Sequence, residues 1–302
     1  MTLSVSPTSR SHQTTAETSA KVLVGIVTRN RHEVLPKAIE SALRQRYPRL
    51  EVAVLDDGSE DDTPQLQFLY PAVRWVHWER SRGLLEARNC LMRESDADFF
   101  VSLDDDAWFV DGDEISIAVR HMETHPHVAA AAFDILSPDR EKTNLRSQPR
   151  PTHMFIGCGH ILRISAVREC GFYVPGPGQY GSEELDLCIR LLDRNREIHF
   201  LPGVHVWHDK TNVARDIPAQ HRSGVCNDLA FAVRRCPFPL VLGIIPVKLI
   251  NHLRFSAGNR LLNSCLAGLR LFFSRAGAIW KSREPVRTVT FLNFLRRVHH
   301  TR

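Results

Sequence analysis

Apolar runs alternate with amphipathic segments along the first half of the chain. The runs KVLVGIVT, LEVAVLDDGS, AVRWVHW, ADFFVSLDDD and HVAAAAFDIL start at residues 21, 50, 72, 97 and 127, and each predicts a β-strand. Helical spacing of apolar positions between them predicts helices over residues 33–46, 62–69, 83–94 and 113–123. Strands that alternate with short helical connections form a mostly parallel sheet with helices on both faces. We therefore expect an α/β fold.

Polar residues directly follow three of these predicted strands. They are Thr28-Arg29-Asn30, Asp56-Asp57 and Asp104-Asp105-Asp106. Because ligands bind outside the carboxyl ends of parallel strands, all three groups should open onto one crevice. This convergence is the first functional signal in the sequence.

The three consecutive aspartates are the strongest candidate site. Hard carboxylate oxygens at a strand end suit Mg²⁺ or Mn²⁺, and Mg²⁺ typically takes one or two carboxylates together with substrate phosphates. An EF-hand loop is excluded, since it would place Phe109 where glycine is required and Ile115 where glutamate is required. A solvated acidic loop is the alternative interpretation, and the apolar run FFVSL immediately before the acids argues against it.

Dinucleotide and P-loop sites are excluded by the segment that contains the end of the first predicted strand. GIVTRNR contains no G-x-G-x-x-G and no other glycine-rich phosphate-binding sequence. A phosphate bound in this crevice would therefore be neutralised by a cation rather than by a glycine-rich loop.

The middle of the chain alternates loops with short elements. Ser137–Thr152 is polar and should form a loop, and HMFIGCGHILRIS predicts a strand pair or hairpin. The GCGH sequence at residues 157–160 either lies under an acceptor or forms a tight turn. A Gly/Pro loop then enters a helix that we expect Ser182 to cap, with Glu183 and Glu184 in its first turn. EIHFLPGVHVWHDKTN predicts a short strand followed by a loop.

Positive charge is concentrated at the C-terminal end. Residues 251–302 hold ten Lys and Arg against a single acid, Glu284, whereas the rest of the chain is net negative within a formal total of +5. The stretch PFPLVLGIIPVKLI is too short to span a bilayer, so these Arg-containing apolar segments predict helices that lie on an anionic membrane. A helical cap on the domain, or a dimer surface, is the alternative. No nucleic-acid-binding module is evident, so nucleic acid is not an expected partner.

These differences divide the chain into three regions. Residues 1–20 should be a disordered leader, since half of them are Ser or Thr and no apolar signal segment is present. Residues 21–235 should form the α/β domain, and residues 236–302 a basic amphipathic helical tail. The seven dispersed cysteines, with no C-x-x-C pair, favour reduced and mostly buried thiols in a cytoplasmic protein.

An ordered set of motifs over residues 21–210 resembles the inverting family-two glycosyltransferases, which have the GT-A fold with a Rossmann-like sheet. The motifs are VTRNR (27–31), LDDGSEDDT (55–63), SRGLLEARN (81–89), SLDDDA (102–107), YGSEELDLCIR (180–190) and HVWHDKT (205–211). Their order and spacing are more specific than any one of them. The resemblance implies that residues 21–235 form a nucleotide-sugar-binding and catalytic domain.

The resemblance assigns the nucleotide-sugar donor to the early motifs. The matching positions are Thr28, Arg29, Asn30, Asp56, Asp57, Arg82 and Arg88. Thr28, Arg29 and Asp57 resemble the positions that hold the nucleoside, with Asp56 in support. The two later arginines resemble residues that line the base and diphosphate pocket.

The resemblance also implies a metal site for Mn²⁺ or Mg²⁺. Asp104 and Asp106 match the D-x-D pair of the family, in which the first usually faces the ribose and the last binds the metal. Asp104 is a candidate metal ligand as well, and Asp105 stays ambiguous between donor and metal. His208 matches the histidine that often completes the metal site, with His205 as its competitor.

Glu184 aligns with the catalytic base of the family. Aspartate is the more usual residue there, and the extra methylene group of glutamate shifts the reach of the carboxylate by about 1 Å. The competing interpretation is that Glu183 and Glu184 only stabilise the start of the helix. Asp186 and Arg190 continue the family pattern behind Glu184, which favours the base.

The implied reaction is a metal-dependent, inverting sugar transfer from a nucleotide-diphosphate sugar to a hydroxyl of a saccharide or lipid-linked acceptor, in polysaccharide or glycoconjugate synthesis. A nucleotidyltransferase would need a glycine-rich basic loop after the first strand, and VTRNR is not one. A catalytically degenerate sugar-nucleotide-binding scaffold is the other alternative, supported only by the glutamate at position 184. A tail docked on the cytoplasmic face of a membrane would suit a lipid-linked acceptor.

Overall fold

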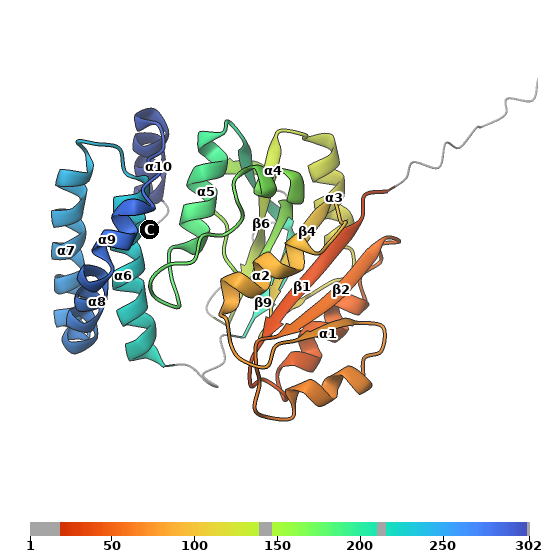
Figure 1. Ribbon diagram of the computed structural model, residues 1–302. Coiled ribbons are helices and arrows are strands. Elements are labelled where there is room, and N and C mark those ends of the chain that lie inside the picture. The colour runs from red at the N-terminus through yellow and green to blue at the C-terminus, as the bar shows by residue number, and fades with distance from the viewer. Residues whose placement is uncertain (1–18, 139–146, 210–215, 301–302) are drawn as a thin grey trace, which may run out of the picture.

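One mixed β-sheet organises the N-terminal two thirds of the chain in this computed structural model, which describes residues 19–138, 147–209 and 216–300 (Figure 1). Its strands are β1 (Val22–Thr28), β2 (Leu50–Asp56), β3 (Arg74–His77), β4 (Phe99–Asp104), β5 (Ala107–Phe109), β6 (Val128–Leu136), β7 (Arg150–Thr152), β8 (Gly159–Arg163) and β9 (Glu197–His208). The order across the sheet is β3-β2-β1-β4-β8-β6-β9-β5, and β7 pairs with β9. The predicted open α/β sheet is confirmed. Its antiparallel ladders come from β5, β7 and β8.

Helices cover both faces of the sheet, as predicted. They are α1 (Leu35–Leu43), α2 (Leu84–Arg93), α3 (Glu114–Thr124), α4 (Ile164–Glu169) and α5 (Glu183–Asp193), with a 3-10 helix at Thr63–Phe68. One apolar layer contains Ile39 of α1 and Met122 of α3, and the other contains Leu91 of α2 and Leu187 of α5. The central strands are therefore buried on both faces, which explains their nearly continuous apolar runs.

The strand register brings the predicted polar groups to one edge of the sheet. Thr28 pairs with Asp56, and Val27 pairs with Asp104, in the two parallel ladders that flank β1. The amide of Asp57 also donates to the carbonyl of Thr28 at 2.9 Å. The predicted convergence of three strand ends is confirmed by this register.

Two segments differ from the prediction. The second half of EIHFLPGVHVWHDKTN was expected to be a loop, yet β9 continues for twelve residues to His208. Phe133 and Asp134 of β6 pair with residues 201 and 205, so residues 202–204 form a bulge that accommodates the Pro-Gly pair. The expected loop over Ser137–Thr152 includes β7 at its end, and its residues 139–146 lie outside the described residues.

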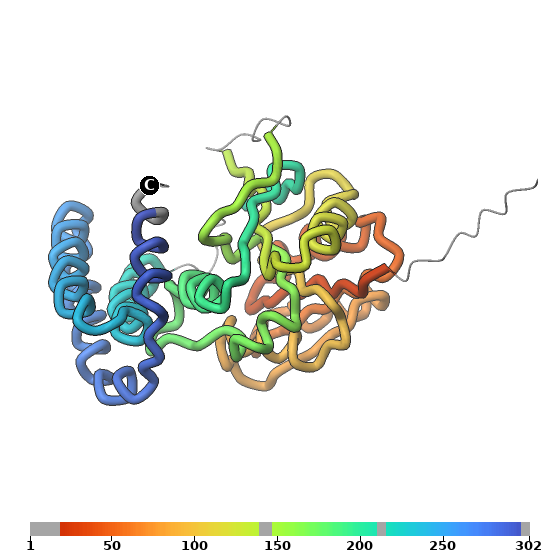
Figure 2. Tube along the Cα trace, turned by 90° about the horizontal axis from the view of Figure 1, so that it is seen from above, coloured from red at the N-terminus to blue at the C-terminus, as the bar shows by residue number. Residues whose placement is uncertain are grey.

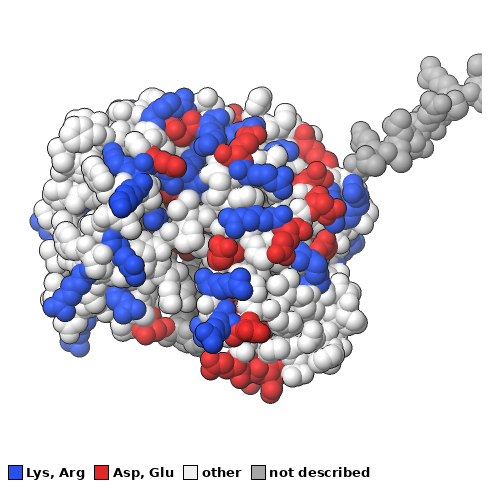
Figure 3. All heavy atoms as spheres, in the orientation of Figure 1, with Lys and Arg blue, Asp and Glu red and all other residues white. Residues whose placement is uncertain are grey.

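The C-terminal helices form a layer beside α5 (Figure 1, Figure 2). They are α6 (Ile217–Arg235), α7 (Val241–Gly258), α8 (Leu262–Ser274), α9 (Ala276–Lys281) and α10 (Thr288–His300). α6 is central to this layer, because its Val225 and Leu229 share a core with Phe272 of α8. Lys and Arg side chains, separated by uncharged surface, are spread over the left part of the molecule (Figure 3). Among the described residues, no helix is long and apolar enough to cross a membrane.

A buried ion network joins α5 to α6. Asp186 accepts a hydrogen bond from Nε of Arg190 at 2.7 Å and another from Nε of Arg235 at 2.6 Å. All three side chains are at most 6% exposed. Removing one member of such a network would leave a buried charge uncompensated. The network therefore fixes the helix that begins with Glu183 and Glu184 onto the C-terminal layer.

Candidate active site

Arg88 is the buried cation at the centre of the strand-end crevice. Its side chain extends from α2, is 2% exposed, and donates from Nη2 to Asp104 Oδ1 at 2.7 Å. The same nitrogen donates to the carbonyl of Gly157 at 3.2 Å. The other terminal nitrogen, Nη1, is buried without a hydrogen-bond partner among the described residues. A buried donor left unpaired costs about 1–3 kcal/mol, so an oxygen of a bound ligand is its expected partner.

Asp105 turns toward β1 rather than toward Asp104. Its Oδ2 accepts a hydrogen bond from the Thr28 hydroxyl at 2.9 Å. Burial raises the pKa of Asp105 to about 7, the charge of Arg31 opposes the shift, and the two neighbouring aspartates add to it. The acidic cluster therefore carries fewer than three full charges near neutral pH. Sequence reasoning missed Arg31, which also lies 3.9 Å from Asp106 through Nη1.

Strand pairing brings His208 to Asp106. Ala107 pairs with His208 in the ladder of β5 and β9. The Nε2 atom of His208 lies 3.2 Å from Asp106 Oδ1, yet it is buried and makes no hydrogen bond. His205, the competitor along the sequence, places Nδ1 3.1 Å from Asp111 instead. The structure thus brings His208, and not His205, to the aspartates.

Asp57 shapes the loop that leads into α2. Its carboxylate accepts hydrogen bonds from Ser81 Oγ at 2.6 Å, from the Arg82 amide at 2.6 Å and from the Gly83 amide at 3.0 Å. Both oxygens are therefore engaged with the protein itself. Sequence reasoning considered Asp57 only as a ligand of the nucleoside, and this second role depends on a loop 25 residues away that no local pattern reveals.

Asp56 and Asn30 likewise hold loops together. Asp56 is 2% exposed, and its Oδ2 lies 3.3 Å from Nδ1 of His77. Asn30 has a left-handed backbone (φ 54°), and its side-chain oxygen accepts from the Glu60 amide at 2.8 Å. Arg29, by contrast, is exposed and makes no hydrogen bond or ion pair with the described residues. Thr28, Asn30 and Asp56 are thus assembled at the strand ends, and Arg29 is not fixed there.

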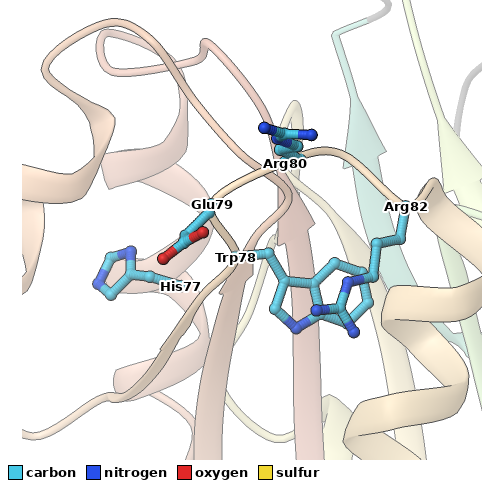
Figure 4. A pocket seen from close by; sticks show the side chains of 5 residues that line it. All are labelled: His77, Trp78, Glu79, Arg80 and Arg82. Carbon is cyan, nitrogen blue, oxygen red and sulfur yellow. The ribbon is translucent and has the colours of Figure 1, made fainter.

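A cavity of about 420 Å³ lies beside these loops (Figure 4). It is lined by His77, Trp78, Glu79, Arg80 and Arg82. The Arg82 guanidinium lies over the Trp78 ring, 4.6 Å from its centroid. Of the two arginines that the resemblance assigns to the donor, Arg82 therefore lines an open cavity. Arg88 is buried and binds the partly exposed Asp104.

Glu184 lies at the start of α5, next to the hairpin that precedes β8. Ser182 occupies the N-cap position, but its backbone is left-handed (φ 68°) and its side chain makes no capping hydrogen bond. The prediction that Ser182 caps the helix is therefore wrong, since a backbone in this region does not direct the hydroxyl at the helix amides. A β-carbon on Gly157 would lie only 2.5 Å from Glu184 Oε1. The glycine thus leaves the space that the carboxylate occupies.

The charge of Glu184 is controlled by its surroundings. The side chain keeps some accessible surface but is enclosed by protein atoms, and this burial is the main reason that its pKa rises to about 8. The nearby charge of Glu183 adds to the shift, and Arg88 opposes it. A carboxyl group in this state takes up or releases a proton near physiological pH. The helix-start interpretation alone does not explain why its carboxylate shares a pocket with Arg88 and Gly157.

Helix α6 supports the loop that leads to Glu183. Asn227 accepts a hydrogen bond from the Gly178 amide at 2.8 Å and donates to the carbonyls of Gly178 and Tyr180 at 3.0 and 2.9 Å. A β-carbon on Gly176 would lie 2.3 Å from Asn227 Oδ1, and one on Gly178 would lie 2.8 Å from the Ser223 backbone. The Gly/Pro loop is therefore fitted closely to α6. Sequence reasoning missed Asn227, because nothing in its surrounding sequence marks it.

Comparison with known proteins identifies the family. The sequence profile described as "Glycosyl transferase family 2" matches residues 23–172, about half of the chain. The chain belongs to glycosyltransferase family 2. An uncharacterized glycosyltransferase of Bacillus subtilis (strain 168), YwdF, is 31% identical over 162 residues, which are 53% of this chain and 58% of that protein.

Two further similarities agree with the family. The Escherichia coli UDP-Glc:alpha-D-GlcNAc-diphosphoundecaprenol beta-1,3-glucosyltransferase WfaP is 30% identical over 105 residues, 34% of this chain and 41% of that protein. The mannosyltransferase PcManGT from Pyrobaculum calidifontis, solved with GDP-Man and Mn²⁺, has a TM-score of 0.59 at 17% identity, covering 86% of this chain and 76% of that chain. The predicted GT-A fold is therefore confirmed. This family-2 chain spans between two fifths and three fifths of the length of these two curated relatives.

The residues of this family-2 site fit a divalent cation. A carboxylate oxygen of Asp104, the thiol of Cys158 and a ring nitrogen of His208 all lie within 4.8 Å of one another. The buried Nε2 atoms of His205 and His208 both lack a hydrogen-bond partner among the described residues, but it is the one of His208 that lies 3.2 Å from Asp106 Oδ1. Carboxylate oxygens suit Mn²⁺ and Mg²⁺, and the imidazole of His208 is a common metal ligand. The sequence predicted Cys158 only as a reduced, buried thiol. The Gly157-Cys158-Gly159 turn places its sulfur beside Asp104 and His208.

Mn²⁺ binding separates the two candidate histidines. We expect His208→Ala to weaken Mn²⁺ binding about tenfold or more, because a ligand with a buried, unpaired nitrogen is lost. His205→Ala should leave the affinity near that of the native chain, since its ring lies against Asp111. Electron paramagnetic resonance titration of free Mn²⁺ measures both affinities. Loss of binding in His205→Ala with full binding in His208→Ala would contradict the assignment.

Proposed function

We propose that this chain is an inverting, metal-dependent glycosyltransferase. It transfers a sugar from a nucleotide-diphosphate sugar to a hydroxyl of a saccharide or lipid-linked acceptor in polysaccharide or glycoconjugate synthesis. One observation carries the proposal: the Arg88 guanidinium binds Asp104 at the end of β4, and its charge also acts on Glu184 of α5. An anionic group held by Arg88 would therefore lie near Glu184, the proposed base.

The strand ends would hold the donor. Thr28, Asn30 and Asp56 lie at the carboxyl edge where the nucleoside is expected, and Arg29 is exposed and able to close over it. Asp57 would contribute by fixing the Arg82 backbone, so that Arg82 and Trp78 line the cavity beside the base. The structural similarity to PcManGT, which was solved with GDP-Man, supports this donor class.

The acidic cluster would hold the metal. Asp104, Asp106 and His208 would bind it, with Cys158 beside them. A bound divalent cation would supply positive charge to the leaving diphosphate. Arg88 supplies a second positive charge from the protein, and its unpaired Nη1 is available to a phosphate oxygen.

Glu184 would take the proton of the acceptor hydroxyl. As the hydroxyl oxygen attacks the anomeric carbon, the bond from that carbon to the diphosphate breaks on the opposite face. The proton goes to Glu184, the sugar to the acceptor oxygen and the electron pair to the diphosphate. One displacement of this kind inverts the configuration at the anomeric carbon.

Turnover of nucleotide sugars tests the proposed function. We expect the protein with Mn²⁺ to release nucleoside diphosphate from at least one donor of a panel, and Glu184→Gln to lower the rate by ~10²–10⁴-fold. Because burial and Glu183 raise the pKa of Glu184 to about 8, the base is formed as pH increases, and kcat/KM should rise through that range. Glu184→Gln should abolish this rise. Tight diphosphate binding without turnover on any donor or acceptor would favour the scaffold alternative.

Gly157→Ala tests the placement of the base without removing it. The new β-carbon would lie 2.5 Å from Glu184 Oε1 and in ordinary contact with the Arg88 guanidinium at 3.6 Å, so we expect the flexible carboxylate to move while the fold stays intact. A displacement of about 1 Å can cost ~10²-fold in rate. Steady-state kinetics together with the thermal midpoint check this expectation. Gly277→Ala is the matched control, since its β-carbon would meet no atom within 4 Å. Equal rates in the two variants would contradict the placement.

A further inference from the structure

We propose that the outer face of α7 to α9 docks on the surface of an anionic lipid bilayer. Of the twenty exposed large hydrophobic side chains among the described residues, twelve lie between Phe238 and Leu292. Apolar exposure is thus concentrated in the C-terminal layer rather than on the catalytic domain. The proposal concerns where the protein works, and it does not depend on the transfer reaction.

Helix α7 has one face packed on the protein and one face uncovered. On the packed side, Lys248 and His252 bind Asp228 of α6 at 2.5 and 2.9 Å. On the other side, Leu242, Val247 and Ile250 are 65%, 55% and 48% exposed. At about 100° per residue these positions fall within an arc of about 140° of the helix, so they form a broad apolar face along α7. No described residue covers this face.

The neighbouring helices extend this apolar surface. Leu262, Leu266 and Phe273 of α8 are 44%, 47% and 65% exposed, at helical spacing. Trp280 of α9 is 60% exposed, and an exposed indole is typical of side chains at a membrane interface. Contiguous exposed apolar area on a soluble domain marks an interaction surface.

The basic side chains of this layer fall into two groups. Lys248, Arg283 and Arg287 bind groups of the protein itself. A second group is exposed and makes no ion pair with the described residues: Arg254, Arg260, Arg270, Arg275 and Lys281. From residue 236 to residue 300 the sequence holds a single acid, Glu284, which is 3.1 Å from Arg235. The uncovered face is therefore strongly cationic as well as apolar.

An anionic bilayer is the occupant that satisfies both properties. Its headgroups neutralise the free arginines, while its acyl region receives Leu, Ile, Phe and Trp side chains. A second copy of this chain would bring one cationic face against another, which is unfavourable. Nucleic acid would satisfy the charge but not the apolar face. Because no described helix can span a bilayer, the helices would lie in its plane.

One end of the docking face lies at the same end of the molecule as the strand ends. In Figure 1 the carboxyl ends of β1 and β2 point to the lower end, where the turn between α7 and α8 also lies. Arg254 at the end of α7, Arg260 in the turn and Leu262 at the start of α8 are exposed there.

Vesicle binding of the full chain tests the proposal. We expect it to co-sediment with phosphatidylcholine vesicles containing 30% phosphatidylglycerol at least tenfold better than with pure phosphatidylcholine, and more weakly at 1 M NaCl. Two variants probe the face: Leu242→Gln with Val247→Gln and Ile250→Gln, and Arg254→Gln with Arg270→Gln and Arg275→Gln. Each should lose most of the binding. Phe68→Gln with Leu69→Gln is the matched control, because these side chains are 74% and 70% exposed on the catalytic domain.

Three results would overturn the proposal. The first is equal binding to both kinds of vesicle, and the second is equal loss of binding in the control and in the two face variants. The third is a native chain that does not bind vesicles and forms a dimer in light scattering, when the variant with the three apolar substitutions in α7 is a monomer. Donor turnover measured on the same samples without vesicles reports on the proposed function separately, since the altered residues lie outside the crevice.

Discussion

Carboxylates crowd the end of β4 beyond what the neighbouring cations can neutralise, and the other features of the site depend on this constraint. Asp104 lies close enough to Glu183 and Glu184 of α5 to affect their pKa values, and Asp105 and Asp106 follow it in the chain. Of the described cations, Arg31 lies 3.9 Å from Asp106 and Arg88 binds Asp104. Burial and the neighbouring carboxylates raise the pKa of Asp105 to about 7 and the pKa of Glu184 to about 8. The remaining negative charge is what a divalent cation would neutralise. The same crowding would therefore account both for the proposed metal site and for the raised pKa of Glu184, the proposed base.

The fold assembles this cluster from distant parts of the chain. Parallel register aligns the ends of β1, β2 and β4, and the bulge in β9 lets that strand continue until His208 reaches Asp106. Gly157 leaves room for Glu184, and α6 holds the preceding loop through Asn227. The C-terminal layer is thus connected to the base, because Arg235 of α6 also binds Asp186 in α5. The same layer carries the face that we propose for membrane docking.

Local sequence patterns predicted the strands, the helices and the shared edge, because buried runs and helical spacing are local properties. The length of β9 was underestimated, because Pro202-Gly203 usually ends a strand. Here the pairing with β6 continues past these two residues through a bulge. Arg31, Cys158 and Asn227 were missed because their roles arise from contacts across tens of residues. The choice between His205 and His208 needed the β5–β9 register, which spans about one hundred residues. Family resemblance supplied what these patterns lack, namely the order of motifs.

The stereochemistry of transfer tests the central claim most directly. If Glu184 deprotonates an acceptor that attacks opposite to the diphosphate, the sugar must change its anomeric configuration in one step. Real-time NMR measures the anomeric configuration of the first product formed from a donor of defined anomer. Where water is the acceptor, the spectrum is recorded before the free sugar undergoes mutarotation. The account predicts a product of the opposite configuration in every turnover, with the signal absent in Glu184→Gln. A product that retains the donor configuration would contradict the single displacement and the role of Glu184.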